Sequence, residues 1–222
     1  MRFYRARSAN EPNLFQIWEG GGARGDSITP STFSPEYRTW MHEKLVYHLK
    51  RNLGSGLLSL GCGNATIEAE LVRAGYRVLG VDAMPEAVDL ALAKGVEATR
   101  ADLITWAPDQ PWSTIYMDGV LGHLYDPDDG LTPLLRRIRS WLTPGESGTA
   151  TLIVSNDDTK DGSPAQPASG VPGFHWLSGP FMRDHALAAG FDAVDVEHFT
   201  YRRPESGDRL RSVIVAHAEG AS

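Results

Sequence analysis

Segments with helical and with strand-like periodicity alternate through the middle of this chain. Residues 36–50 carry apolar side chains at helical spacings, and residues 57–60 form a short apolar run that opens a series of strand-like segments. The later strand-like segments cover residues 76–82, 96–103, 114–117 and 149–155. Helix-like segments separate them, so the pattern predicts an α/β fold with a mostly parallel sheet.

The last part of the chain breaks this alternation. A helix-like segment at 180–189 precedes two strand-like runs, 191–199 and 209–217, and no helix-like segment separates these two runs. We expect them to pair as an antiparallel hairpin at the edge of the sheet. The connection 156–178 is rich in Pro, Gly and Asp and has no periodicity, and its length indicates a functional or mobile loop.

The first 35 residues have no regular pattern but are rich in aromatic side chains. This composition is atypical of a disordered tail. We therefore predict an ordered arm over residues 1–35, ahead of a main domain at 36–222. The arm either covers part of the core or forms a lid over a ligand.

A glycine turn and a carboxylate mark the first two strands. Gly61 and Gly63 directly follow the first strand-like run, and Asp82 ends the second. Glycine lets the backbone approach a ligand closely, and an ionised carboxylate can accept hydrogen bonds from both hydroxyls of a ribose. The unit predicts a nucleoside site.

Two residues after the glycine turn add to this picture. Asn64 is expected to cap the next helix. Thr66 stands where a dinucleotide fingerprint places its third glycine, which argues against a nicotinamide or flavin cofactor.

Over roughly residues 40–218, the chain resembles the class I S-adenosylmethionine-dependent methyltransferases. Residues 58–65 (LSLGCGNA) resemble the first motif of that family, and the other matching segments are residues 80–82, 101–103, 112–124, 142–145 and 189–191. The resemblance implies a doubly wound, seven-stranded, mostly parallel sheet with an antiparallel last strand, in a three-layer α/β/α sandwich. It also implies a small-molecule methyltransferase with S-adenosyl-L-methionine as donor and S-adenosyl-L-homocysteine as product.

The resemblance further implies which residues bind the donor. Asp82 would bind the ribose, Asp102 and Leu103 would contact the adenine, and the turn after the fourth strand would lie beneath the sulfonium. The complete predicted set is Leu60, Gly61, Cys62, Gly63, Asp82, Ala83, Met84, Asp102, Leu103, Met117, Asp118 and Gly119.

Two positions depart from the family pattern. Ser59 stands where the family usually carries an acid that helps to hold the ammonium group of the donor, and Ser113 replaces a common aspartate. Asp118 and Asp26 are candidates to replace the first acid. The departure leaves open a donor-binding protein whose chemistry has lapsed, or another reaction of the sulfonium such as cyclisation or alkyl transfer. An NAD(P)-dependent oxidoreductase is a further alternative, although Thr66 argues against it.

Histidines are the candidates for a general base, which an oxygen acid requires for methylation and a neutral amine does not. His123 matches the Glu-His-Leu position that is frequent in the family, and His175 lies in the long connection. Each is either a catalytic residue or a packing residue. For the acceptor we predict contacts with Tyr4, Trp18, Tyr37, His175 and Trp176.

Charge and composition limit the partners. The formal net charge is −7 and no Lys/Arg cluster is present, which disfavours nucleic-acid binding. The sequence lacks an apolar run of about 18 residues and an apolar N-terminal signal region, so we expect no membrane partner. Cys62 is the single cysteine, which excludes an intrachain disulfide and favours the cytoplasm. No His or carboxylate spacing predicts a metal site.

We therefore expect a cytoplasmic monomer or homodimer with a small-molecule substrate. Members of the family with so short a chain often methylate metabolites, including natural-product intermediates, at oxygen, nitrogen or carbon.

Overall fold

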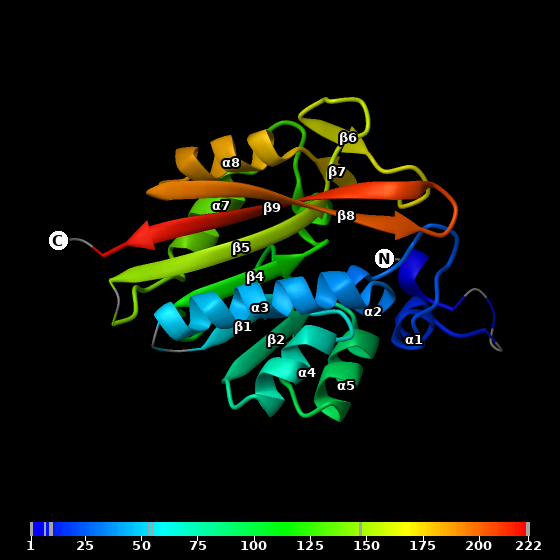
Figure 1. Cartoon of the computed structure of the whole chain (residues 1–222), viewed down its shortest axis with the longest axis horizontal. Coiled ribbons are helices and arrows are strands. Elements are labelled where there is room, and N and C mark those ends of the chain that lie inside the picture. The colour runs from blue at the N-terminus through cyan, green and yellow to red at the C-terminus, as the bar shows by residue number, and fades with distance from the viewer. Residues whose placement is uncertain are drawn as a thin grey trace.

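The structure, a computed structural model, describes residues 2–6, 8, 11–52, 54, 56–146 and 148–220. Seven strands form one sheet in the order β3-β2-β1-β4-β5-β9-β8, with a two-stranded sheet, β6-β7, beside it (Figure 1). The strands of the large sheet are β1 (Leu57–Leu60), β2 (Val78–Asp82), β3 (Glu97–Arg100), β4 (Thr114–Asp118), β5 (Thr149–Asp157), β8 (Ala193–Arg203) and β9 (Gly207–Glu219).

The direction of β9 distinguishes this sheet from a wholly parallel one. β1 to β5 run parallel to one another, whereas β9 pairs antiparallel with both β5 and β8. The predicted hairpin and the seven-stranded, mostly parallel architecture are therefore confirmed. The hairpin strands extend further than predicted, to Arg203 and from Gly207.

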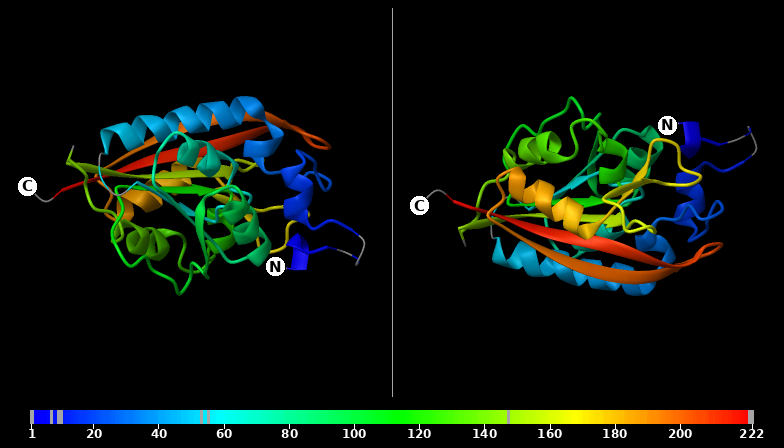
Figure 2. Two further views of the ribbon diagram at one scale, coloured as in Figure 1. Left: turned by 90° about the horizontal axis from the view of Figure 1, so that it is seen from below. Right: turned by 90° about the horizontal axis from the view of Figure 1, so that it is seen from above.

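Helices cover both faces of the sheet, as two views of the ribbon show (Figure 2). One apolar core lies between the sheet and α3 (Pro35–Arg51), α4 (Thr66–Arg73) and α5 (Pro85–Ala93). The other core lies between the opposite face and α6 (Leu121–Leu124), α7 (Thr132–Arg139) and α8 (Gly179–Ala188). Because both faces are covered, the central strands are buried along their length, as in other α/β folds.

The N-terminal segment contains short elements that pack at the carboxyl edge of the sheet. They are η1 (Arg2–Tyr4), α1 (Leu14–Glu19) and α2 (Pro30–Phe33). Leu14, Phe15 and Trp18 are buried against Met84 and Ala87 at the start of α5. Residues 1, 7, 9 and 10 of the predicted arm lie outside the described residues.

The long connection after β5 is more ordered than its composition predicted. It contains the hairpin of β6 (Ala165–Pro167) and β7 (His175–Leu177). Gly122 of α6 lets this hairpin approach closely, because a Cβ there would overlap the carbonyl oxygen of His175. Burial and backbone contact with α6 therefore order a segment that has no periodicity of its own.

The predicted helix cap at Asn64 is wrong. The cap of α4 is Ala65, which adopts a left-handed conformation with φ 49° and makes no side-chain capping bond. The Asn64 amide instead donates to Glu19 Oε2 at 3.2 Å, which ties the glycine turn to α1. A tertiary partner thus replaces the local capping bond.

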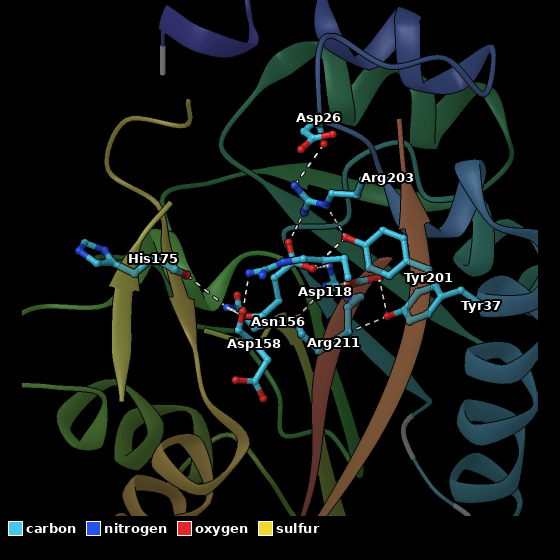
Figure 3. A network of polar contacts seen from close by, with 12 residues as sticks. Asp26, Tyr37, Asp118, Asn156, Asp158, His175, Tyr201, Arg203 and Arg211 are labelled. Carbon is cyan, nitrogen blue, oxygen red and sulfur yellow. Dashed lines mark hydrogen bonds and ion pairs between the residues drawn. The ribbon is translucent and has the colours of Figure 1, made fainter. Parts of the chain in front are cut away.

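A buried arginine joins β9 to the carboxyl ends of β4 and β5 (Figure 3). The Arg211 guanidinium pairs with Asp118 and with Asp157, whose Oδ1 lies 3.1 Å from Nη1. It also donates through Nε to Ser155 Oγ at 2.9 Å. Burial alone would lower the pKa of Arg211, but Asp118, Tyr37 and Asp157 raise it well above its usual value. The arginine therefore stays charged and cross-links three strands.

A second arginine extends this network to the N-terminal segment. Arg203 pairs with Asp157 and donates to the carbonyl oxygen of Asp26 at 3.1 Å. The Asp26 carboxylate in turn accepts from the backbone N–H groups of Glu205 and Ser206. The tip of the β8–β9 hairpin is therefore fixed to the residues before α2.

We predict that Arg211→Met destabilises the fold by about 3–5 kcal/mol, because it leaves the Asp118 carboxylate without its cation and the buried Asp157 with Arg203 alone. Arg202→Met is the matched control. Arg202 is exposed and lies 3.7 Å from Asp208, so its loss is expected to cost less than about 1 kcal/mol. Urea unfolding of the two variants measures the difference, and equal stabilities would contradict the structural role of Arg211.

Candidate active site

A cavity of about 450 Å³ opens at the carboxyl ends of the central strands. Ligands of open α/β sheets bind at this edge, where the strand order reverses. The wall combines the loops after β1, β2, β3 and β4 with the N-terminal segment and the connection after β5. The predicted residues that line it are Tyr4, Trp18, Gly61, Cys62, Gly63, Asp82, Ala83, Met84, Asp102, Leu103, Asp118, Gly119, His123 and Trp176.

The loop after β1 needs its two glycines. Gly61 and Gly63 adopt left-handed conformations, with φ 73° and 54°. A Cβ at Gly61 would overlap the side chain of Val120, whereas a Cβ at Gly63 would meet nothing within 4 Å. The first glycine therefore permits packing against the loop after β4, and the second leaves open space on the cavity wall.

Asp82 is fixed beside this loop by backbone donors. Its Oδ2 accepts from the Gly63 N–H at 3.0 Å, and its Oδ1 accepts from the Met84 N–H at 2.9 Å. Burial raises the pKa of Asp82, and the hydrogen bonds from Met84 and Gly63 oppose that shift. A carboxylate offers about four acceptor positions, and the backbone N–H groups of Gly63, Met84 and Ala83 occupy part of them, so the group retains capacity to accept from a ligand.

Glu68 on α4 is a cavity residue that the sequence analysis missed. Its side chain is buried, and Oε1 accepts from Ser59 Oγ at 2.6 Å. Burial raises the pKa of Glu68 to about 7, although the bond from Ser59 opposes the shift. An acid is therefore present next to the position where the family pattern places one. The sequence shows that Glu68 lies near the start of a helix, two residues after Thr66. Its pairing with Ser59 is a tertiary contact, which the sequence alone does not indicate.

The two acids that were candidates for this position are engaged elsewhere. Asp26 holds the hairpin tip and is absent from the described lining of the cavity. Asp118 lines the cavity but pairs with Arg211, and its Oδ2 accepts from Tyr37 and Tyr116 at 3.1 and 3.0 Å.

His123 lies where three segments meet over the cavity. Its Nε2 is 2.5 Å from the Tyr4 hydroxyl oxygen, and its ring lies 4.7 Å from the Phe174 ring. Burial lowers the pKa of His123, while a hydrogen bond to the backbone of Gly173 opposes the shift. Burial also raises the pKa of Tyr4, so the tyrosine keeps its proton and donates to the neutral imidazole.

Four predicted residues do not line the cavity. Leu60 and Met117 face each other on adjacent strands and point into the core under α7 and α8. His175 points away from the cavity, with its ring 4.9 Å from the Tyr125 ring (Figure 3). The physical reason is the alternation of side chains along a strand: Trp176 faces the cavity, so its neighbour His175 faces the other way.

Tyr37 is the fourth of these residues. It is fully buried, and its hydroxyl donates to Asp118 and contacts Ser155 Oγ at 2.7 Å. It therefore supports the cavity wall from behind and does not contact an acceptor.

One end of the cavity is lined by charged groups that the sequence analysis also missed. Asp157, Arg203 and Arg211 reach it from the ends of β5, β8 and β9. The alternation of Arg209 and Arg211 with apolar residues in β9 was the available signal. The pairing of Arg211 with two carboxylates became visible only when the hairpin was placed beside β5, whereas Arg209 donates to the backbone carbonyl of Asp158.

The described part of the chain contains no group of three or more His, Cys, Asp or Glu residues that could hold a metal ion. Among its helices, none has the length and apolar character needed to cross a membrane.

Comparison with known proteins agrees with this geometry. A family model described as "Methyltransferase domain" matches residues 36–206. A "Tabtoxin biosynthesis enzyme" from Pseudomonas amygdali pv. tabaci is 40% identical over 210 residues, which cover 93% of this chain and 81% of that protein.

Solved structures share the fold at lower sequence identity. The 1,6-didemethyltoxoflavin-N1-methyltransferase of Burkholderia thailandensis, with 1,6-didemethyltoxoflavin and S-adenosylhomocysteine bound, gives a TM-score of 0.60 at 20% identity and covers 86% of this chain and 85% of its own. A SAM-dependent methyltransferase from Archaeoglobus fulgidus gives 0.59 at 16% identity and covers 81% and 94%. Because the family model matches most of the chain, we conclude that the chain belongs to the methyltransferase domain family.

Proposed function

We propose that this protein transfers the methyl group of S-adenosyl-L-methionine to an oxygen, nitrogen or carbon nucleophile of a small metabolite. The observation that carries the proposal is a cavity that combines a nucleoside-type wall, Gly63 and Asp82, with the half-buried base candidate His123. The relative named for tabtoxin biosynthesis supports an intermediate of natural-product biosynthesis as the acceptor.

The residues on the cavity wall fit the donor. Asp82 has acceptor capacity left for the ribose hydroxyls, and the open side of Gly63 leaves room beside it. Asp102 and Leu103 would contact the adenine, and Ala83 and Met84 would contact the face of the base. When bound, S-adenosyl-L-methionine supplies an electrophilic methyl carbon on a positively charged sulfur.

The chain's own contribution is alignment and exclusion of water. Tyr4, Phe15 and Trp18 form an aromatic cover on one side of the cavity, which limits the access of water to the reacting groups. We propose that these residues act as a lid. The charged end beside Arg203 and Asp157, together with Trp176, would contact the polar part of the acceptor. Binding of both reactants in one cavity supplies the proximity that methyl transfer requires.

His123 is suited to accept a proton from the acceptor. Its imidazole is neutral at pH 7 because burial lowers its pKa, so it has basic capacity without prior deprotonation. Its Nε2 contacts the Tyr4 hydroxyl, and proton transfer requires the imidazole to exchange this partner for the acceptor.

That contact also favours a second candidate function, a donor-binding protein with lapsed chemistry, in which Tyr4 holds His123 permanently. Release of S-adenosyl-L-homocysteine in the presence of candidate acceptors decides between the two functions. Binding of the donor without turnover across a broad metabolite panel would favour the second. Membership of a methyltransferase family argues against an NAD(P)-dependent oxidoreductase. We further propose that the protein acts in the cytoplasm as a monomer or homodimer.

We predict that Asp82→Ala weakens S-adenosyl-L-homocysteine binding by about 1.5–3 kcal/mol, roughly 10- to 150-fold, because it removes charge-assisted bonds to the ribose. Isothermal titration calorimetry measures the change. Asp89→Ala, which removes an exposed carboxylate on α5, is the control and should bind like the parent. An unchanged dissociation constant in Asp82→Ala would refute the ribose role.

For His123→Ala we expect methylation turnover to fall by about 100-fold or more, while the affinity for S-adenosyl-L-homocysteine changes by less than about threefold. Tyr4→Phe keeps the aromatic ring but removes the hydroxyl, so it should retain turnover if His123 is the base. Turnover of His123→Ala equal to that of the parent would assign the histidine to structure.

A further inference from the structure

Glu68 and Ser59 form a buried polar pair on the wall of the cavity. Glu68 is 4% exposed and Ser59 is 2% exposed, and both line the cavity. The serine hydroxyl donates to Glu68 Oε1 at 2.6 Å, which fixes the orientation of the carboxyl group. The pair therefore presents an oriented carboxyl group to whatever occupies this part of the cavity.

No cation of the described chain forms an ion pair with this carboxyl group. The nearest candidate is Lys94 at the end of α5, but its ammonium lies 2.6 Å from both Glu19 Oε2 and the Asn64 carbonyl oxygen. The ammonium of Lys94 therefore pairs with α1 and with the loop after β1, and not with Glu68. Arg211 is directed to Asp118 and Asp157.

The other titratable groups around Glu68 do not supply a positive charge either. Asp118 on β4 is a carboxylate and acts to raise the pKa of Glu68. Tyr116 on β4 and Cys62 in the glycine loop face it as neutral groups, because burial raises the pKa of each. A buried carboxylate without a cation is costly, so the site favours a ligand that brings one.

We propose that Glu68, oriented by Ser59, is a subsite for a primary ammonium group, namely that of the amino-acid portion of the methyl donor. This assignment rests on the proposed function. The family pattern has an acid at the position of Ser59, on the strand. In this chain the acid stands on the first turn of α4, and the short serine side chain leaves room for its carboxyl group and bonds to it.

The assignment couples donor binding to a proton. With a pKa of about 7 in the free protein, Glu68 carries its proton in a large part of the molecules at neutral pH. An ammonium ligand binds the ionised form, so binding releases this proton. Affinity should therefore fall as the pH drops below 7, by up to tenfold per pH unit, and should level off above pH 8.

The test compares two ligands that differ only in the amino-acid portion. S-adenosyl-L-homocysteine carries the ammonium group, whereas 5′-methylthioadenosine shares the nucleoside and the sulfur but lacks that portion. We expect Glu68→Gln to bind S-adenosyl-L-homocysteine about 10- to 100-fold more weakly than the parent and to bind 5′-methylthioadenosine unchanged. Glu70→Gln, on the same helix but paired with Arg38 at the surface, is the control and should bind both like the parent.

The readout is calorimetry at pH 6.0 to 8.0 in two buffers with different ionisation enthalpies, which counts released protons. The parent should release close to one proton with S-adenosyl-L-homocysteine at pH 6.0, and Glu68→Gln should release none. Unchanged binding by Glu68→Gln, or equal loss for both ligands, would overturn the ammonium assignment while the parent's binding still supports the proposed function. If the parent binds neither ligand, the proposed function itself fails.

Because 5′-methylthioadenosine binding is measured on the same preparation, it also shows that Glu68→Gln is folded. Ser59→Ala provides a second variant: it removes the orienting hydroxyl and should weaken only S-adenosyl-L-homocysteine, by about threefold to tenfold.

Discussion

The pairing of Arg211 with Asp118 and Asp157 is the contact on which the geometry of the cavity depends. β9 runs antiparallel to both of its neighbours, so it brings its side chains to the carboxyl edge from the opposite direction. The guanidinium of Arg211 on β9 then pairs with carboxylates on β4 and β5 and so fixes the three strands relative to one another. A buried ionic group is stable only when its partners are complete, so each of the three side chains constrains the other two.

This pairing gives the cavity two unlike ends. At one end, the ion-paired groups are held rigidly and offer a ligand only the hydrogen-bonding capacity that the network leaves unused. At the other end, aromatic side chains of the N-terminal segment provide an apolar surface that requires few hydrogen bonds from a ligand. A ligand that spans the cavity must therefore combine a polar part with a flat or apolar part.

The sequence allowed much of the fold to be predicted, because the strands and helices of the main domain follow local periodicity. Asp82 and the two glycines were also predictable, since they follow strands directly. Three kinds of feature could not be predicted from the sequence. Met117 and His175 were placed at the site without regard to strand alternation, which turns their side chains away. Glu68 was missed because its orientation on the cavity wall depends on a tertiary bond to Ser59. The cap prediction for Asn64 was wrong because the Asn64 amide bonds to Glu19 instead.

The N-terminal segment is fastened at several places around the cavity. Tyr4 bonds to His123 after β4, Glu19 bonds to Asn64 and Lys94, and Asp26 bonds to the tip of the β8–β9 hairpin. A segment held at several points cannot swing aside as a rigid body about one hinge. Exchange of a large ligand requires at least one attachment to open first. Ligand entry and product departure are therefore expected to share one conformational step, the opening of these attachments.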